Sequence, residues 1–377
     1  MPARNEIHSA EDARRLARRR LPRLVFDFID GAAGYETTAR RNRSALTNIR
    51  LQPRVLLDVK SRTLAKTFLG EKMGLPFGIA PMGMCNLAWP GADSMLADAA
   101  ARHRIPLCVS TAASTAMETL RQRAGRHAWF QLYAGESGEA SLRMALRAQE
   151  AGYDHLILTV DAPQVARRPR DLHNGFQLPF RLGIRQVRDF ALHPRWSLAT
   201  LCNGSPRPVN FDSLGGFARH AGRSTANMAF LEKLRAKWLG KLIVKGISCT
   251  QDARRVVQAG ADAIYVSNHG GRQLDSAPPS VEALAAIRAA LGADCSLVFD
   301  SGVRSGEDVV KALALGADFV MLGRPLLYAL GAGGARGLSE LISLLAEEID
   351  LTLAQLGARS VTDVDGEVLA SQPRVVS

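Results

Sequence analysis

Several features are missing from this sequence, and each absence narrows the class of protein. No run of about 18 apolar residues occurs, so a transmembrane helix is not expected. The five cysteines lie far apart and form no CxxC pair, which argues against a zinc site or a disulfide framework and favours reduced thiols. The first residues carry too many charges for the apolar core of a secretory signal. We therefore expect a cytoplasmic protein with no metal site.

Acidic residues are scarce in one part of the chain. The net charge is +12, and residues 165–240 hold thirteen Lys or Arg against four Asp or Glu, a surplus of nine. Most of the positive excess therefore belongs to one segment. A nucleic-acid partner is a poor fit, because the fold predicted below places this segment beside the active site.

Eight short apolar segments alternate with alanine-rich stretches of helical period. They are 77–81, 106–111, 128–133, 155–161, 241–246, 263–268, 296–302 and 318–323. This alternation indicates parallel strands, and eight of them fit an α/β fold of the (β/α)₈ (TIM) barrel type better than an open sheet. We predict a single domain over 1–377, with an N-terminal helical extension over 1–75 and a helix capped at Ser9. A long loop or lid over 165–240 follows the fourth strand.

Polar and glycine residues follow most of the predicted strands, where barrel enzymes place their chemistry. Gly302 with Arg304, and Gly323 with Arg324, follow the last two strands and match the phosphate site of such barrels. Tight turns with solvated arginines are the alternative. Lys245 ends an apolar strand, where an unpaired ammonium is costly, so it needs an anion or an electron-rich acceptor beside it. A Schiff-base lysine or a structural ion pair would also explain it.

The segment SNHGGRQLD, residues 267–275, places a histidine, two glycines and an arginine directly after the sixth strand. A neutral His269 imidazole can remove a proton while the guanidinium of Arg272 holds a carboxylate. Asp161, predicted on the other side of the barrel mouth, can stabilise the imidazolium that forms. A lone histidine in a loop is more often structural. The base, the arginine and the paired glycines together predict a catalytic site.

The same residues carry a resemblance to a known family. SNHGGRQLD is similar to the active-site signature of the FMN-dependent 2-hydroxy-acid dehydrogenases and oxidases, which include glycolate oxidase, L-lactate dehydrogenases and mandelate dehydrogenase. The resemblance extends through LPRLVFDFIDGAAG, FQLY, LTVDAP, ARRPRDLHNGF, LIVKG, DSGVRSGEDVVKALALGA and LGRP, and so covers nearly the whole chain. RDLHNGF and LHPRWSL make the sequence most similar to the mandelate dehydrogenase members.

The resemblance implies FMN as the cofactor and oxidation of an (S)-2-hydroxy acid to the 2-oxo acid. The α-hydrogen passes to the flavin as a hydride, or its electrons follow after proton abstraction from carbon. The implied catalytic residues are His269, Asp161 and Tyr133, and the implied substrate-binding residues are Arg168, Arg272, Tyr133 and Phe28. The implied FMN-binding residues are Pro81, Met82, Gly83, Ser110, Gln131, Thr159, Lys245, Ser267, Asp300, Gly302, Arg304, Gly323 and Arg324. A quinone or another acceptor that receives the electrons, and a homo-oligomer, are implied as well.

Three positions depart from the family pattern. Phe28 stands where a tyrosine hydroxyl usually contacts the substrate carboxylate, and losing one charge-assisted hydrogen bond costs about 1.5–3 kcal/mol of binding. Met82 replaces a common threonine, and the adjacent Gly83 favours a dehydrogenase over an oxidase. Ala112 replaces a bulky tryptophan, so we expect a large or aromatic substrate such as mandelate. The alternatives are an oxidase that makes hydrogen peroxide, and an FMN-binding protein with an altered substrate class or little activity because of Phe28.

Aromatic and basic residues are mixed within residues 174–200. Phe176, Phe180, Ile184, Phe190 and Trp196 interleave with Arg181, Arg185, Arg188 and Arg195. Such a mixture suits the surface of an anionic membrane. The resemblance to mandelate dehydrogenase implies a peripheral contact here with the inner face of the membrane. A lid that packs on its own barrel, with solvated arginines, is the alternative.

Overall fold

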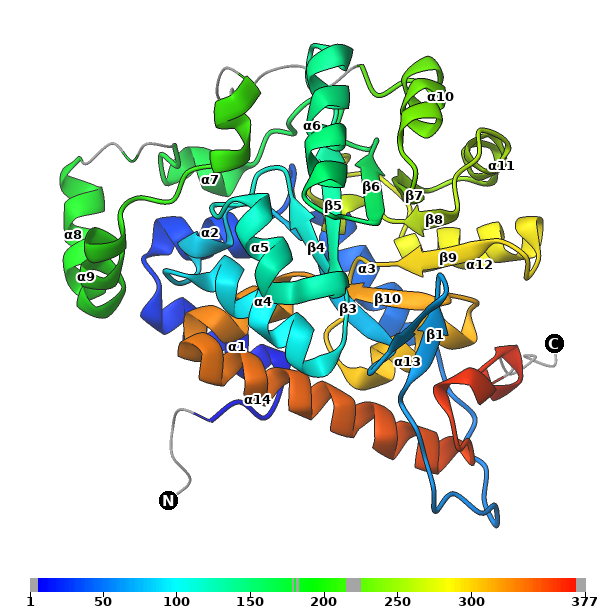
Figure 1. Cartoon of the computed structure of the whole chain (residues 1–377). Coiled ribbons are helices and arrows are strands. Elements are labelled where there is room, and N and C mark those ends of the chain that lie inside the picture. Colours follow the sequence, from blue (N-terminus) through cyan, green and yellow to red (C-terminus); the bar gives the residue numbers. More distant parts are fainter. Residues whose placement is uncertain (1–5, 178–179, 181–182, 215–224, 371–377) are drawn as a thin grey trace.

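Eight parallel strands close into a barrel at the centre of the molecule, as the computed structural model shows for residues 6–177, 180, 183–214 and 225–370 (Figure 1). In spatial order the strands run β10-β3-β4-β5-β6-β7-β8-β9. Their bounds are β3 Phe77–Met82, β4 Leu107–Ser110, β5 Ala128–Tyr133, β6 His155–Thr159, β7 Lys241–Ile247, β8 Ala263–Val266, β9 Ser296–Phe299 and β10 Phe319–Leu322. Each strand falls on a predicted apolar segment, so the prediction of a (β/α)₈ barrel is confirmed.

The interior of the barrel is filled by every second strand residue, because successive side chains of a strand point to opposite faces. Trp129, Ile157, Tyr265 and Phe319 belong to this inner cluster. A small antiparallel hairpin adds to it, formed by β1 (Lys66–Phe68) and β2 (Glu71–Met73). The Phe68 ring lies 6.2 Å from Trp129 and 5.2 Å from Phe319, measured between ring centroids, at the amino-terminal ends of β5 and β10. The hairpin therefore covers that end and leaves the carboxyl end for a site.

Helices surround the barrel and bury the outward-facing strand residues. They are α4 Ala92–His103, α5 Met117–Ala124, α6 Gly138–Glu150, α11 Thr250–Gln258, α12 Ser280–Leu291, α13 Gly306–Ala314 and α14 Arg324–Leu356. α14 is interrupted at Gly334, whose φ of 59° and ψ of −141° are not helical. Within the described residues, no helix combines the length and the apolar character that crossing a bilayer requires.

Three helices precede the barrel: α1 Ala10–Arg20, α2 Arg23–Asp30 and α3 Thr37–Asn48. The Ser9 side chain accepts a hydrogen bond from the backbone N–H of Asp12 at 3.0 Å, so the predicted cap is present. A Cβ at Gly331 of α14 would lie 2.7 Å from the Leu21 side chain. This close approach holds the N-terminal extension against the last helix.

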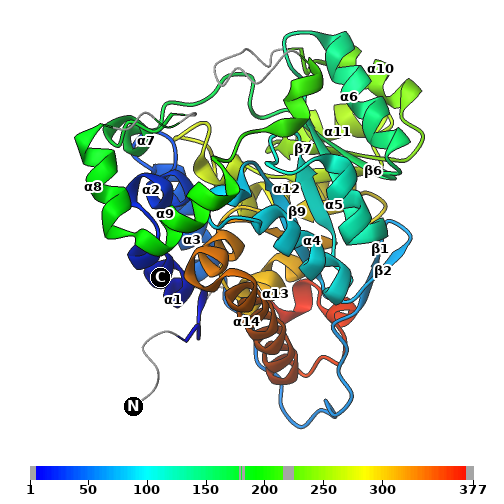
Figure 2. The same cartoon turned by 60° about the vertical axis from the view of Figure 1, so that its left-hand side comes forward.

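The segment between β6 and β7 contains four α-helices among its described residues, although the sequence predicted a loop. It contains α7 Pro169–His173, α8 Ile184–Leu192, α9 Pro194–Asn203 and α10 Met228–Lys237. Prolines begin α7 and α9, as expected at a position where the missing N–H has no helical partner. α8 and α9 lie together on one side of the molecule, near α1 and α2 (Figures 1 and 2).

The aromatic residues of this segment point inward, which corrects the part of the membrane hypothesis that rested on them. Phe176 and Trp196 are 7% and 1% exposed, and Phe180 contacts both rings. The Trp196 indole N–H donates to the Leu87 carbonyl at 2.8 Å, which anchors α9 to the barrel. The buried aromatic side chains therefore attach α8 and α9 to the rest of the protein.

Candidate active site

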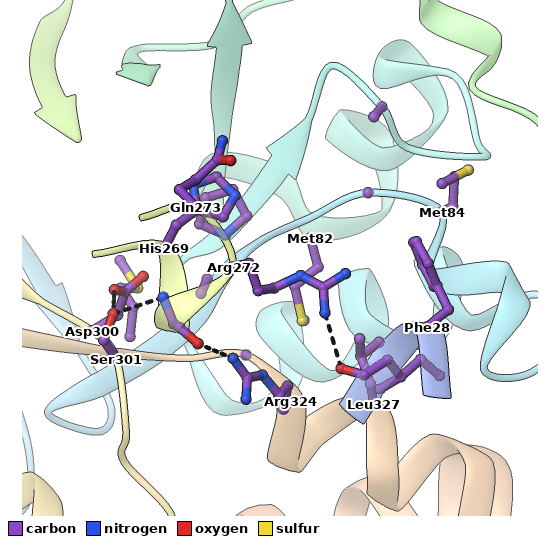
Figure 3. Close-up of a pocket in the computed structure, with 18 of the residues that line it drawn as sticks. Phe28, Met82, Met84, His269, Arg272, Gln273, Asp300, Ser301, Arg324 and Leu327 are labelled. Carbon is purple, nitrogen blue, oxygen red and sulfur yellow. Dashed lines mark hydrogen bonds between the residues drawn. The ribbon is translucent and has the colours of Figure 1, made fainter. Parts of the chain in front are cut away.

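A cavity of about 300 Å³ lies at the carboxyl end of the barrel (Figure 3). The predicted site residues on its wall are Phe28, Pro81, Met82, Gly83, Tyr133, Arg168, Lys245, His269, Arg272, Asp300, Gly302, Arg304, Gly323 and Arg324. The other predicted site residues lie behind this wall. Four of them are buried: Ser110, Gln131, Thr159 and Ser267. Two of them are hydrogen bonded to wall residues, Ser267 to Lys245 and Asp161 to His269. The fold therefore gathers the predicted site around one cavity.

His269 stands between an aspartate and a tyrosine. Its Nδ1 lies 3.0 Å from Asp161 Oδ1, and its Nε2 lies 3.3 Å from the Tyr133 hydroxyl. An ionised carboxylate only accepts hydrogen bonds, so Nδ1 carries the proton and Nε2 presents its lone pair to the cavity. The sequence placed Asp161 across the barrel mouth, whereas the structure puts it in direct contact. This arrangement suits a general base.

The backbone around His269 is folded to aim the imidazole at the cavity. His269 has a φ of 59°, in the left-handed region that only glycine adopts freely, and Gly270 follows with a φ of 65°. The Gly270 N–H donates to Ser301 Oγ at 3.0 Å, and the His269 N–H donates to Ser267 Oγ at 3.0 Å. The glycine after the histidine is thus required by the turn itself.

The surroundings of His269 favour a neutral imidazole and an ionised aspartate. Burial lowers the pKa of His269 and outweighs the opposing effect of Asp161. For Asp161, burial would raise the pKa, but His269 and Lys245 together hold it below its usual value. Asp161 Oδ2 is also buried and has no hydrogen-bond partner among the described residues, which leaves the carboxylate able to stabilise a cation nearby. The histidine is therefore ready to accept a proton.

Lys245 is a buried cation on β7 with two buried partners. Its Nζ donates to Ser267 Oγ at 2.7 Å and lies 3.5 Å from Asp300 Oδ2. Burial would lower the pKa of Lys245, but Asp300 and Asp161 raise it above its ordinary value, so the ammonium stays charged. At Gly246 a Cβ would lie 2.5 Å from the Asp161 Cβ, so only glycine lets Asp161 come this close. The ion-pair alternative raised from the sequence is therefore present, and Lys245 also reaches the cavity.

A row of polar side chains crosses the ends of three strands. Ser110 Oγ donates to Gln131 Oε1 at 2.8 Å, and Gln131 Nε2 donates to Thr159 Oγ1 at 2.9 Å. Ser110, Gln131 and Thr159 are 2%, 0% and 4% exposed. Fixed amide and hydroxyl groups at this depth can hydrogen bond a flat heteroaromatic ring that lies over the barrel.

Two arginines stand where an acid could bind between them and His269. Arg168 comes from the residue before α7, and Arg272 follows the His269 turn. Arg272 Nη1 donates to the Gly31 carbonyl at 2.6 Å, and its guanidinium carbon lies 5.4 Å from the centre of the Phe28 ring. Burial lowers the pKa of Arg272, as do the nearby Arg168 and Arg324. Two guanidinium groups held together in a buried site favour a carboxylate ligand.

The opposite part of the cavity has the character of a phosphate site. Gly302 and Arg304 follow β9, and Gly323 and Arg324 follow β10 at the N-terminus of α14. Helix N-termini and glycine amides bind anions in barrels of this type. Burial lowers the pKa of Arg304 to about 10, as expected for a cation that has little water around it. Arg324 donates to the Gly270 carbonyl, which ties this part of the cavity to the His269 turn.

Aromatic and small residues form the remaining wall. Phe28 stacks on Phe176 with a centroid distance of 4.2 Å and an interplanar angle of 7°. Gly83 faces Ala112, where an added Cβ would lie 2.9 Å from the alanine Cβ. In Figure 3, Phe28 and Met84 lie at the other end of the cavity from Asp300 and Ser301. The cavity is therefore apolar at one end and polar at the other.

Sequence reasoning gave no role to several residues of the wall: Met84, Gly270, Gln273, Ser301, Met321 and Leu327. Gly270 and Gln273 lie within the SNHGGRQLD segment, and Ser301 follows Asp300, so position next to a predicted residue was an available signal. Met321 and Leu327 carried no signal, because an apolar residue in a strand or helix is normally part of the core.

Comparison with known proteins agrees with this geometry. The sequence model of a family described as FMN-dependent dehydrogenase matches residues 17–371. The (S)-mandelate dehydrogenase of Pseudomonas putida is 40% identical over 97% of this chain and 94% of its own. The L-lactate dehydrogenase of Pseudomonas syringae pv. syringae is 37% identical over 96% of this chain and 98% of its own. A crystal structure of the monotopic membrane protein (S)-mandelate dehydrogenase superposes with a TM-score of 0.92 at 39% identity, covering 97% of this chain and all of that one (100%).

Proposed function

The chain belongs to the family of FMN-dependent dehydrogenases, and from this premise we propose that it oxidises an (S)-2-hydroxy acid to the corresponding 2-oxo acid. The family makes it an oxidoreductase that acts on a CH–OH group and carries FMN. The observation that carries the proposal is the Asp161–His269–Tyr133 line beside two half-buried arginines on the same cavity wall. A base and a carboxylate clamp on one cavity wall are what this oxidation requires.

Each residue of the proposed mechanism acts on a stated part of the acid. Arg168 and Arg272 bind the carboxylate, and the Tyr133 hydroxyl hydrogen bonds to the oxygen on the reacting carbon. His269 Nε2 takes one proton from the acid, from its hydroxyl or from its α-carbon, and Asp161 stabilises the resulting imidazolium. When bound, FMN supplies the two-electron acceptor.

The residues around the polar end of the cavity fit FMN. Gly302, Arg304, Gly323 and Arg324 would hold its phosphate, because Arg304 is a half-buried cation on the cavity wall suited to an anion. Asp300 would bind the ribityl hydroxyls, and Lys245 would stabilise negative charge on the N1–C2 edge of the ring. We assign the ring edges and faces to Pro81, Met82, Gly83, Ser110, Gln131, Thr159 and Ser267. Lys245 stays protonated there, which its raised pKa supports.

A large or aromatic acid such as mandelate is the proposed substrate. The small residues Gly83 and Ala112 leave room beside the base, and the stacked Phe28 and Phe176 rings offer an apolar surface. The relatives named for mandelate and for lactate support the 2-hydroxy-acid class without choosing between these acids.

Restoring a hydroxyl at position 28 tests how this protein holds the carboxylate. Phe28→Tyr should bind the acid more tightly by about tenfold, because one charge-assisted hydrogen bond is worth about 1.5–3 kcal/mol. The dissociation constant is measured by titrating benzoylformate, the 2-oxo acid of mandelate, and following the flavin absorbance. Phe190→Tyr, which adds the same hydroxyl away from the cavity, is the control. If no acid binds Phe28→Tyr more tightly, the pocket is built for another substrate class.

We propose a quinone or another non-oxygen acceptor for the electrons, with an oxidase as the alternative. Gly83, which is similar to the mandelate dehydrogenase pattern, supports the dehydrogenase. The test reduces the enzyme anaerobically with mandelate and then adds either aerated buffer or the soluble quinone menadione. Rapid reoxidation by the quinone and slow reoxidation by air are expected. Rapid reoxidation by air with one hydrogen peroxide per flavin would establish the oxidase.

We propose that α8 and α9 contact the inner face of a membrane, so that the protein is cytoplasmic and peripheral. Large aliphatic residues on these helices are exposed: Ile184 90%, Leu192 69%, Leu198 62% and Leu201 80%. Arg185, Arg188 and Arg195 accompany them, whereas Arg181 lies outside the described residues. A relative described as a monotopic membrane protein supports this contact.

Replacing two of the exposed aliphatic residues tests the contact. The double variant Ile184→Ser, Leu201→Ser should cosediment with phosphatidylglycerol vesicles about tenfold less than the wild type, because burying one such side chain is worth about 1.5–3 kcal/mol. Leu239→Ser, which removes an equally exposed leucine (84%) before β7, is the control. Equal sedimentation of the double variant and the wild type would contradict the contact.

We also propose that residues 1–377 act as one domain and that the protein forms a homo-oligomer. The packing of α1 against α14 supports the single domain. An exposed apolar loop, with Val55 78%, Leu56 101% and Leu57 48% exposed, supports association with another copy. Light scattering of the purified holoenzyme tests the oligomer, and a monomeric mass at micromolar concentration would contradict it.

A further inference from the structure

Asp30 is the last residue of α2, and its carboxylate accepts hydrogen bonds from side chains of three other helices. Arg14 of α1 donates to both of its oxygens, from Nε at 2.7 Å and from Nη2 at 3.0 Å. The Tyr328 hydroxyl of α14 donates to Oδ1 at 2.7 Å, and Arg170 of α7 donates to Oδ2 at 2.7 Å. The Asp30 side chain is only 5% exposed. None of these residues was singled out by the sequence, and no step of the proposed mechanism uses Asp30.

The two arginines proposed to bind the acid are both attached to this carboxylate through short paths. Arg168 lies two residues before Arg170, whose other Nη donates to Glu36 at 2.6 Å. Arg272 donates to the carbonyl of Gly31, the residue directly after Asp30, at 2.6 Å. Asp30 is therefore the common support of Arg168, which directly precedes α7, and of Arg272, which follows the turn after β8. Figure 3 shows Arg272 reaching toward the segment that carries Phe28.

The charge of Asp30 has a second effect on the cavity. Four arginines line the wall, Arg168, Arg272, Arg304 and Arg324, and their mutual repulsion opposes their approach. Burial would raise the pKa of Asp30, but hydrogen bonds from Arg14, Tyr328 and Arg170 hold it well below the usual range. The carboxylate thus stays ionised and supplies negative charge from outside the space that the acid would fill.

We propose that Asp30 is a positioning residue for the acid substrate, which sets the separation of Arg168 and Arg272 through Arg170 on one side and the Gly31 carbonyl on the other. This inference rests on the proposed function, since it assigns those two arginines to the carboxylate. It predicts that the Asp30–Arg170 contact controls acid binding more than it controls the proton transfer at His269.

Comparing variants of the two arginines that pair with Asp30 distinguishes a positioning role of Asp30 from a purely structural one. Arg14→Met and Arg170→Met each remove one partner from the same buried carboxylate, so both should lower the thermal unfolding midpoint. Arg170 lies in α7, directly after Arg168 and Pro169, whereas Arg14 belongs to α1. Arg170→Met should therefore weaken acid binding by about tenfold or more, since displacing a binding group by about 1 Å can cost up to about 100-fold. Arg14→Met should change acid binding by less than about threefold.

The experiment uses the FMN-loaded full chain and two readouts. The dissociation constant of benzoylformate, a 2-oxo acid that cannot be oxidised further at this carbon, is measured from the change in flavin absorbance. The limiting rate of anaerobic flavin reduction by mandelate is measured in the same variants. Arg170→Lys, which keeps the charge but not the forked contact with Asp30 and Glu36, should recover part of the affinity. Asp350→Asn, which breaks the Arg62 ion pair away from the cavity, is the control for the loss of an ion pair.

The outcomes separate the inference from the function on which it rests. Weak benzoylformate binding by Arg170→Met and Asp30→Asn, with a limiting reduction rate within about threefold of wild type, supports the inference. Wild-type affinity in Arg170→Met, or an equal loss in Arg14→Met, overturns it while leaving the proposed function intact. If Asp30→Asn does not fold, the comparison of Arg170→Met with Arg14→Met still tests the inference. A wild type that binds FMN but is reduced by no 2-hydroxy acid overturns the proposed function itself.

Discussion

His269→Ala should retain FMN and lose its reduction by 2-hydroxy acids. A positioned base contributes about 10²–10⁴-fold to a proton transfer, so the rate of flavin bleaching by mandelate should fall by at least about a hundredfold. FMN content should stay near one per chain, because His269 contributes one wall of the cavity and none of the phosphate-binding groups. Stopped-flow absorbance under anaerobic conditions measures the rate, and His173→Ala, an exposed histidine of α7, is the control.

The pH dependence of the same rate follows from the burial of His269. Because burial lowers the pKa of this imidazole below its ordinary value of about 6.5, the base stays neutral through neutral pH. Bleaching by mandelate should therefore be constant above pH 7 and fall only in more acidic solution. Undiminished bleaching by His269→Ala, or a loss of rate as the pH rises from 7 to 8, would remove His269 from the role of base.

Lys245→Met should destabilise the protein strongly. Lys245 is 3% exposed and faces Asp300 at 3.5 Å, with Asp161 also nearby, so its loss leaves buried carboxylates without their cation. Breaking a buried ion pair by removing one partner costs about 3–5 kcal/mol of unfolding free energy. Chemical denaturation with a fluorescence readout measures it, and the FMN content should fall in parallel, because Lys245 is assigned to the flavin ring.

Lys241→Met is the matched control on the same strand. Lys241 pairs with Asp262 at 3.0 Å, but its side chain is 48% exposed, and such pairs contribute about 0–1 kcal/mol. The two variants differ in burial and share both the element and the chemical change. If Lys245→Met unfolds at the same denaturant concentration as Lys241→Met, the buried charge cluster does not hold this end of the barrel together.

The barrel could be predicted from the sequence because its signal is local. Each of the eight strands is a short apolar run followed by a helical stretch, and parallel strands with crossover helices allow few arrangements. The residues after β8, β9 and β10 could be predicted for the same reason, since a barrel brings its strand ends together. His269, Arg304 and Arg324 therefore line the cavity as expected.

The remaining features depend on contacts between distant segments. Asp30 lies 140 positions from Arg170 and 298 from Tyr328, so no pattern along the chain could reveal the contacts of its carboxylate. The same holds for the distance between Asp161 and His269, which come from the ends of β6 and β8. The aromatic residues between β6 and β7 looked suited to a membrane because composition does not say which side chains face inward. Trp196 packs on the barrel, and Ile184 faces outward.

Phe28, which stands where the family usually has a tyrosine, packs against its neighbours as an apolar ring. The ring stacks on Phe176 and lies beside Arg272, so it contributes apolar surface where a hydroxyl would otherwise reach the carboxylate. Arg272 in turn relies on the Gly31 carbonyl for its orientation. The proposed carboxylate site therefore relies on arginines and their supports, which is why the Asp30 and Phe28 variants are informative together.

Anaerobic mixing of the purified FMN-loaded protein with glycolate, lactate and mandelate tests the central claim most directly, with the flavin absorbance followed before air is admitted. Bleaching by at least one of these acids is predicted, with mandelate the most effective because of the room beside Ala112 and the Phe28–Phe176 surface. A protein that holds FMN but is bleached by none of the acids, while dithionite reduces it fully, would contradict the oxidation of 2-hydroxy acids at this site.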